Sequence, residues 1–154
     1  MILGILAAAV LMLTACGAPK TSPENEAGKV AVSLREKVES VIPDKDSLGP
    51  LTAEDLEDVL GVTPSDYSDF IFLQSEAMDG REVLVIRAAD KDAAGKLTGI
   101  AESYLERRLN ETRSYAPEAY QVLSQAKVQT KNLTVALIVG PDGAKETEAI
   151  LAGE

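Results

Sequence analysis

A turn signal flanked by two apolar segments constrains the fold of this chain most strongly. Asp79-Gly80 is typical of tight β-hairpins, because both residues tolerate the left-handed backbone that such turns require. It lies between segment 69–74, which is rich in Phe, Ile and Leu, and segment 81–88, which contains the run 83–86 of Val, Leu, Val and Ile. Both segments are apolar on both faces, so we expect a sheet that is central or covered on two sides.

A second hairpin is expected in the last quarter of the chain. Segments 127–130 and 133–139 flank a turn at Lys131-Asn132, and the second of them is apolar almost throughout. Two hairpins suit one antiparallel sheet of about four strands. The pattern leaves the order of the strands across the sheet open.

Apolar residues at helical spacing predict helices around these hairpins. The first runs from about residue 29 to 42 and ends before Pro43. The second begins after Thr52, an N-cap residue with Asp55 in the capping-box position, and stops at Gly61.

The longest helix is expected to begin after Asp90, its N-cap, and to continue to about residue 113. Gly95 and Gly99 each weaken such a helix by about 1 kcal/mol relative to alanine, or they permit close packing. Its apolar stripe, with Arg108 at the margin, consists of Leu97, Ile100, Ala101, Tyr104 and Leu105.

Two shorter helices complete the pattern. One opens at Pro117, and the other follows the turn Pro141-Asp142-Gly143 and carries Ile150 and Leu151. The sequence therefore predicts an α+β domain, in which helices pack on an antiparallel sheet and cover at least one of its faces.

The N-terminal segment predicts a lipid anchor. Residues 2–13 are apolar and uncharged, as in the core of a signal peptide, and too few for a transmembrane helix. Leu13-Thr14-Ala15-Cys16 then resembles the lipobox of bacterial lipoproteins, which implies cleavage after Ala15 and acylation of Cys16. The basic segment typical of such signals is missing after Met1, so either the true start lies upstream or the signal is weak. The alternative is a buried N-terminal strand or helix with Cys16 in the core.

These features divide the chain into three parts. Residues 1–15 are the predicted lipoprotein signal peptide, residues 16–28 are the lipidated Cys16 and a flexible polar tether, and residues 29–154 are a single α+β domain. We therefore expect the protein at the cell membrane, held by its lipid on the extracytoplasmic face.

Composition excludes several kinds of chemistry. The chain has no histidine, and its one cysteine is the predicted lipidation site. Histidine general bases, Ser-His-Asp triads, Cys-His pairs and histidine zinc sites are therefore excluded. The net charge of −10 opposes binding to nucleic acid through general electrostatics. We expect no catalytic residue, no metal site and no cofactor.

Three short segments carry a resemblance to a known family. They are Arg81-Glu82-Val83-Leu84-Val85, a strand that opens with glutamate, Tyr115-Ala116-Pro117-Glu118-Ala119-Tyr120, a Tyr-x-Pro-x-x-Tyr element, and Lys127-Val128-Gln129-Thr130-Lys131-Asn132, a strand and turn. Over about residues 29–151 the chain resembles the uncharacterised lipoproteins of clostridia and related Gram-positive bacteria that are grouped as a domain of unknown function. The resemblance implies a lipid anchor and a Gram-positive source, and it brings no known activity or substrate.

Tyrosines and arginines near the end of the long helix form a candidate patch for an anionic or glycan ligand. The patch consists of Tyr104, Arg107, Arg113, Tyr115 and Tyr120, and Arg108, Lys127 and Lys131 could join it. The alternative is that the arginines favour the helix C-terminus and shield tyrosine rings. Glu82 is expected to stay exposed at the start of its strand, and a buried pair with one of these arginines is the alternative.

Two acidic segments suggest further hypotheses. Segment 44–49 begins like a calcium loop, but Leu48 stands where a ligand is normal and the twelfth position is Asp55 instead of glutamate. A solvated acidic loop is the alternative. The carboxylates of Glu54, Asp55, Glu57 and Asp58 are explained by the positive end of a helix dipole, without a catalytic pair.

The sequence thus predicts a non-enzymatic, lipid-anchored binding or interaction domain. Its expected partners are the membrane, through the N-terminal lipid, and an unidentified envelope protein or wall component, with no nucleic acid. The rival hypothesis is a carboxylate-dependent envelope enzyme or enzyme accessory, which needs opposed carboxylates in a groove. A solute-capture lipoprotein of a transporter is a third class, for which this domain is small.

Overall fold

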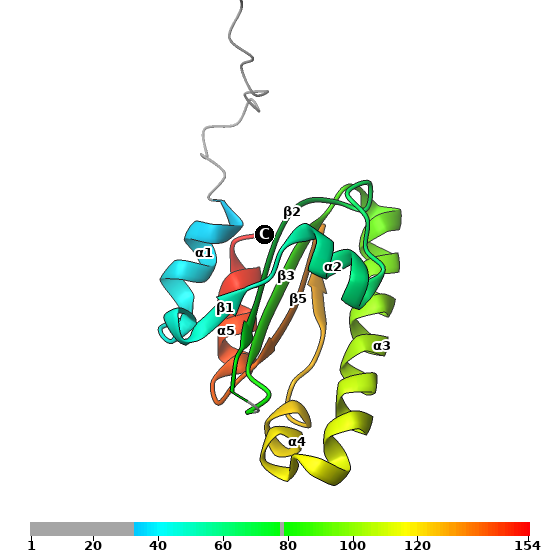
Figure 1. The fold of residues 1–154 in the computed structure, drawn as a ribbon. Coiled ribbons are helices and arrows are strands. Elements are labelled where there is room, and N and C mark those ends of the chain that lie inside the picture. The colour runs from blue at the N-terminus through cyan, green and yellow to red at the C-terminus, as the bar shows by residue number, and fades with distance from the viewer. Residues whose placement is uncertain (1–32, 78) are drawn as a thin grey trace, which may run out of the picture. The chain divides into compact units, whose positions relative to one another are not determined.

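The computed structural model describes residues 33–77 and 79–154 (Figure 1). The predicted signal peptide with Leu13, Thr14 and Ala15, the lipidation site Cys16 and the tether lie outside these residues. Among the helices that are described, none combines the length and the apolar composition that crossing a bilayer requires.

The described residues form five α-helices, one 3₁₀ helix and five strands. The helices are α1 (Leu34–Val41), α2 (Ala53–Leu60), α3 (Lys91–Tyr115), α4 (Pro117–Leu123) and α5 (Gly143–Ala152), with a 3₁₀ turn η1 (Lys45–Ser47). The strands are β1 (Leu48–Pro50), β2 (Tyr67–Ser75), β3 (Glu82–Ala88), β4 (Gln129–Lys131) and β5 (Thr134–Val139).

The strands form one five-stranded sheet in the order β1-β2-β3-β5-β4, and every neighbouring pair is antiparallel. Both predicted hairpins are present, as β2–β3 and β4–β5. The central pair β3–β5 joins them, with Leu84 opposite Leu137. The α+β class and the antiparallel sheet are therefore confirmed.

The fifth strand, β1, was not expected from the sequence. It lies in the segment considered as a calcium-like loop, and it pairs Gly49 with Gln74 and Pro50 with Leu73. Gly and Pro are depleted in strands, and a proline is tolerated there because β1 is at the edge of the sheet. Three residues carry no readable alternation, so local pattern does not reveal this strand.

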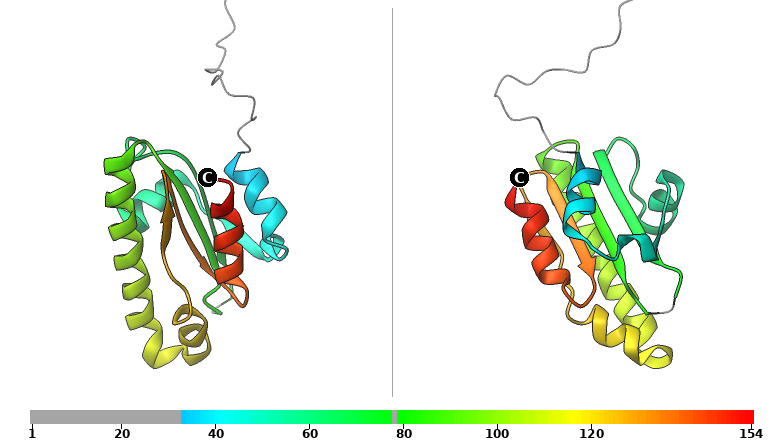
Figure 2. Two further views of the ribbon diagram at one scale, coloured as in Figure 1. Left: turned by 180° about the vertical axis from the view of Figure 1, so that it is seen from behind. Right: turned by 90° about the vertical axis from the view of Figure 1, so that its left-hand side faces the viewer.

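Helices cover both faces of the sheet (Figure 2). On one face α2, α3 and α4 pack with the buried residues Leu84, Ile86 and Leu137. On the other face α1 and α5 pack with Val83 and Val85 of the same strand. The apolar runs in β3 and β5 are thus buried on both sides, as the continuous hydrophobicity of these segments predicts.

The helix ends follow the capping signals. Thr52 and Asp55 form the predicted capping box, and Gly61 has the left-handed backbone of a C-cap, with φ 68°. Asp90 caps α3 through the Ala93 N–H group. Ser33 is the N-cap of α1 and forms a second capping box with Glu36, and residues 29–32 of the predicted first helix lie outside the described residues.

Gly80 has close neighbours that Gly95 and Gly99 lack. An added Cβ at Gly95 or at Gly99 would meet no atom within 4 Å, so these glycines of α3 do not serve close packing. Gly80 has φ +80°, and a Cβ there would lie 3.2 Å from the carbonyl oxygen and the Cβ of Ala119. The turn between β2 and β3 therefore rests directly against α4.

Candidate ligand-binding site

A buried glutamate organises one end of the layer between α3 and the sheet. Glu82, the first residue of β3, is 1 % exposed. Its Oε2 atom accepts hydrogen bonds from the Tyr104 hydroxyl at 2.6 Å, from Arg108 Nη1 at 2.7 Å and from Gln74 Nε2 at 3.1 Å. Arg108 Nη1 also donates to the Tyr104 oxygen at 2.8 Å. We call Gln74, Glu82, Tyr104 and Arg108 the Glu82 cluster.

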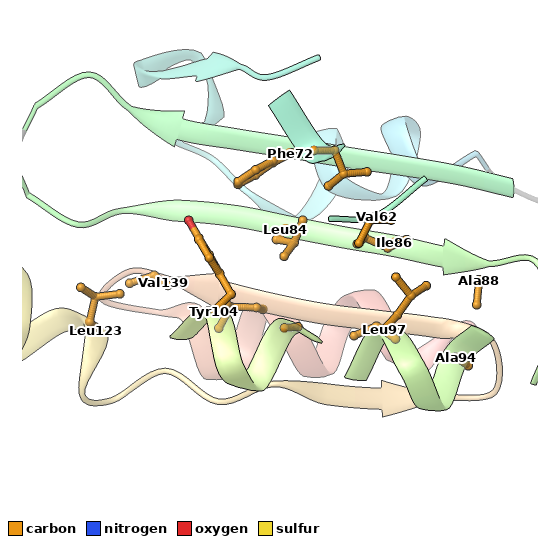
Figure 3. Close-up of a cluster of buried hydrophobic side chains, with 14 residues drawn as sticks. Val62, Phe72, Leu84, Ile86, Ala88, Ala94, Leu97, Tyr104, Leu123 and Val139 are labelled. Carbon is orange, nitrogen blue, oxygen red and sulfur yellow. The ribbon is translucent and has the colours of Figure 1, made fainter. Parts of the chain in front are cut away.

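The expectation that Glu82 stays exposed was wrong, and the alternative of a buried pair with an arginine is what the structure has. Side chains two apart in a strand share a face, so Glu82 points to the same side as the buried Leu84 and Ile86. Tyr104 and Arg108 are four apart on α3 and therefore share a helix face. Figure 3 shows the Tyr104 ring reaching from α3 with its hydroxyl toward β3.

The cluster places ionisable groups in a largely buried environment. Burial raises the pKa of the Glu82 carboxyl above its ordinary value, against the opposing effects of Tyr104, Arg108 and Gln74. Burial, and then the neighbouring Glu82 carboxylate, raises the pKa of the Tyr104 hydroxyl as well. All three donors meet one oxygen, and Glu82 Oε1 is buried without a hydrogen-bond partner in the described structure. Such an unsatisfied buried acceptor is uncommon in folded proteins and calls for an explanation.

A cavity of about 280 Å³, which we call the hairpin cavity, adjoins this cluster. It lies where the β2–β3 turn, the end of α3 and the start of α4 meet. It is lined by Gln74, Ser75, Glu76, Ala77, Gly80, Arg81, Arg108, Thr112, Tyr115, Ala116 and Ala119. Gln74 and Arg108 belong to both the cluster and the lining, so the buried carboxylate holds two groups of the cavity wall in place.

The structure does not gather the predicted tyrosine and arginine patch around one cavity. Tyr104 is buried, and Arg107 stacks on its ring at 5.4 Å while donating to the Val59 carbonyl oxygen. Arg113 stacks on Tyr120 at 5.5 Å. These contacts match the alternative in which arginines shield tyrosine rings. Tyr115, 63 % exposed, lines the hairpin cavity together with Arg108, a possible further member of the predicted patch.

A larger groove of about 500 Å³ is lined by residues of α1, η1, β1 and β2. Its polar lining residues are Arg35, Glu39, Lys45 and Asp46, two of each sign. In contrast to the hairpin cavity, no buried polar side chain with an unsatisfied atom adjoins it in the described structure. We therefore take the hairpin cavity as the candidate site.

The acidic segments show no convergence on a cation. In residues 33–77 and 79–154, no group of three or more Asp or Glu side chains is placed to hold a metal ion. Segment 44–49, which the calcium hypothesis needs as a loop, is instead η1 and the start of β1. Asp55, its twelfth position, accepts from Thr52 N–H in the capping box.

The protein is an α+β domain with helices on both sheet faces and an arginine-lined cavity beside a buried carboxylate. Residues 42–140 match the family described as a domain of unknown function, DUF4358, and the chain belongs to this family. The matched residues contain the whole Glu82 cluster and the whole lining of the hairpin cavity. A search of curated proteins and a search of solved structures each found no match.

Proposed function

We propose that this protein is a lipid-anchored binding domain on the extracytoplasmic face of a Gram-positive bacterial membrane, and that the hairpin cavity is its binding site. One observation carries the binding role: Arg108 is held at Nη1 by Glu82 and Tyr104 while its side chain lines a cavity. A preformed concavity with a few fixed polar groups is the usual form of a small-ligand site.

The anchoring part of the proposal is supported by the lipobox-like sequence that ends at Cys16 and by the apolar run before it. Growing cells with a palmitate analogue tests it. We expect the wild-type protein and Thr14→Ser, which keeps a permitted lipobox residue, to be labelled, and Cys16→Ser to be unlabelled and released from the membrane fraction. Labelling of Cys16→Ser would refute the anchor.

The binding part is tested by crosslinking in living cells. A photo-crosslinking amino acid replaces Glu76, which is exposed on the cavity wall, and in a matched strain it replaces Glu148, which is exposed on α5. We expect mass spectrometry to find a reproducible adduct from position 76 and none of the same mass from position 148. Identical adducts from both positions, or none from position 76, would contradict a binding site in this cavity.

The rival function, a carboxylate-dependent envelope enzyme, is favoured by the buried Glu82 carboxyl, whose pKa is raised by burial. A carboxyl group with a raised pKa can serve as a general acid near neutral pH. However, Glu82 lies behind the cavity wall and not in it, and Glu76 is the one acidic residue of the described lining. Release of products from purified wall fragments by wild-type protein, abolished in Glu82→Gln, would replace our proposal with this one.

A further inference from the structure

The open edge of Arg108 indicates which ligands fit the hairpin cavity. Its Nη1 atom is used by Glu82 and Tyr104. In the described structure no hydrogen bond uses Nε or Nη2 of this guanidinium. These two nitrogens lie on one edge of the planar group, and their parallel N–H bonds match the two oxygens of a carboxylate.

The charge balance of the cavity disfavours a ligand with two or more negative charges. Arg81, the second guanidinium of the lining, donates from Nε to Asp79 at 2.8 Å and from Nη1 to Ser47 at 3.1 Å. Each arginine therefore already faces one carboxylate, and Glu76 adds a further negative charge at the wall. A doubly charged phosphate group would meet no surplus of positive charge here, in a chain whose net charge is −10.

The rest of the lining suits a ring. The Tyr115 side chain is 63 % exposed and offers an aromatic face at the cavity. Sugar rings and aromatic rings both stack on such faces. Gly80 and Ala119 both line the cavity, where the β2–β3 turn lies against α4, and a volume of about 280 Å³ suits a ligand of about one ring with its substituents.

We propose that the hairpin cavity binds a small ring-bearing monocarboxylate, with the carboxylate on Nε and Nη2 of Arg108 and the ring on Tyr115. The proposal rests on the proposed binding function and names its ligand class. Glu82 is a positioning residue in this arrangement, because it fixes the Nη1 side of the guanidinium and leaves the opposite edge to the ligand.

The test is a titration of the full-length protein in detergent micelles, followed by the ¹⁵N-edited NMR signal of Arg108 Nε. The probes are glucuronate and benzoate, their neutral counterparts glucose and benzamide, and inorganic phosphate. We expect at least one carboxylate probe to shift the Nε–H signal saturably, and the neutral counterpart to leave it unchanged. Equal binding of the neutral probe, stronger binding of phosphate, or no saturable shift with either carboxylate would overturn the proposal.

Variants separate recognition from folding. Arg108→Lys keeps the charge but loses the parallel donors, and we expect carboxylate affinity to fall by about tenfold. Arg107→Lys is the matched control, because Arg107 is adjacent in sequence but does not line the hairpin cavity. Tyr115→Ala is a second variant at an exposed position. Thermal unfolding checks that it is folded, and it too must weaken binding.

If position 76 crosslinks a partner in cells while both carboxylates fail to bind, the ligand class is wrong and the binding function stands.

Discussion

At the scale of single residues, the Glu82 cluster shows that the two charges of a buried pair are not equivalent. The Glu82 side chain is 1 % exposed, whereas that of Arg108 is 18 % exposed and lines a cavity. If Glu82 loses its charge, Arg108 can hydrate from the cavity. If Arg108 is lost, the carboxylate stays in the core without a counter-charge. Removing one partner of a buried pair is costly mainly for this reason.

We therefore predict that Arg108→Met lowers the free energy of unfolding by about 3 kcal/mol at neutral pH. Glu82→Gln, which retains an acceptor for the three donors, should cost about 1 kcal/mol. The double variant should be more stable than Arg108→Met alone. Urea denaturation measures all three, and equal losses in the two single variants would contradict this account.

The pH dependence of the Arg108→Met variant follows from the same carboxyl group. Burial holds the pKa of Glu82 above its value in the unfolded chain. A carboxyl group whose pKa is higher in the folded state makes its full contribution to the free energy of unfolding below its pKa in the unfolded chain, which is about 4.3. This contribution is lost as the pH rises through the pKa of the folded state. The deficit of Arg108→Met should thus shrink as the pH falls from neutral toward about 4. A deficit that is constant with pH would show that lost packing, and not the stranded charge, is the cause.

Gly80 and Gly61 allow a second comparison of single residues. Both have a positive φ, +80° and +68°, but only Gly80 has neighbours within 4 Å of an added Cβ. Gly61→Ala should cost about 1 kcal/mol through the backbone alone. Gly80→Ala should cost at least twice as much, because the Ala119 backbone must also move. Thermal unfolding compares the two variants. Equal losses of stability would mean that the β2–β3 turn does not contact α4 in solution.

The burial of Glu82 and the shape of the site were only partly predictable at this scale. Alternation with Leu84 and Ile86 places Glu82 on the core side, and the pairing of Tyr104 with Arg108 follows from their spacing. The stripe of the long helix already placed Arg108, and not Arg107, at its margin, but that Arg108 pairs with Glu82 did not follow, because the contact joins α3 to β3. The hairpin cavity unites Gln74, Arg108 and Ala119, whose contact depends on tertiary packing that no local pattern contains.

At the scale of elements, strong local signals predicted the five α-helices and four of the five strands of the described residues. The capping box of α2, the Asp90 cap of α3 and the apolar runs of β3 and β5 are confirmed by the structure. The missed strand β1 owes its pairing to β2 and not to its own residues. The order of strands likewise depends on the β3–β5 contact between two distant hairpins.

Alanine in place of either glycine of α3 is expected to stabilise the protein. Neither Gly95 nor Gly99 has an atom within 4 Å of an added Cβ, and both lie within the helix. Replacing either with alanine should stabilise the protein by about 0.5–1 kcal/mol, because alanine loses less backbone entropy on folding. Thermal unfolding tests this. A loss of stability would mean that the space beside the helix is filled in solution.

At the scale of the whole molecule, stability should be centred on the two inner strands. Every residue of β5 and nearly every residue of β3 is buried, whereas β1 and β4 are short and lie at the edges. Amide protons in strands that are covered on both faces of the sheet exchange only on extensive unfolding. Hydrogen exchange followed by mass spectrometry should therefore find β3 and β5 slowest and β1 among the fastest strands. Uniform protection across the sheet would contradict this gradient.

The pairing of Glu82 with Arg108 also has an evolutionary consequence. The two residues are 26 positions apart and meet only in the folded chain. If the arginine is replaced first, the intermediate protein has an unpaired buried carboxylate and is strongly destabilised. If the glutamate is first replaced by glutamine, the intermediate loses less stability. In an alignment of the DUF4358 family these two columns should vary together, and homologues with the acid but without the arginine should be the rarest combination.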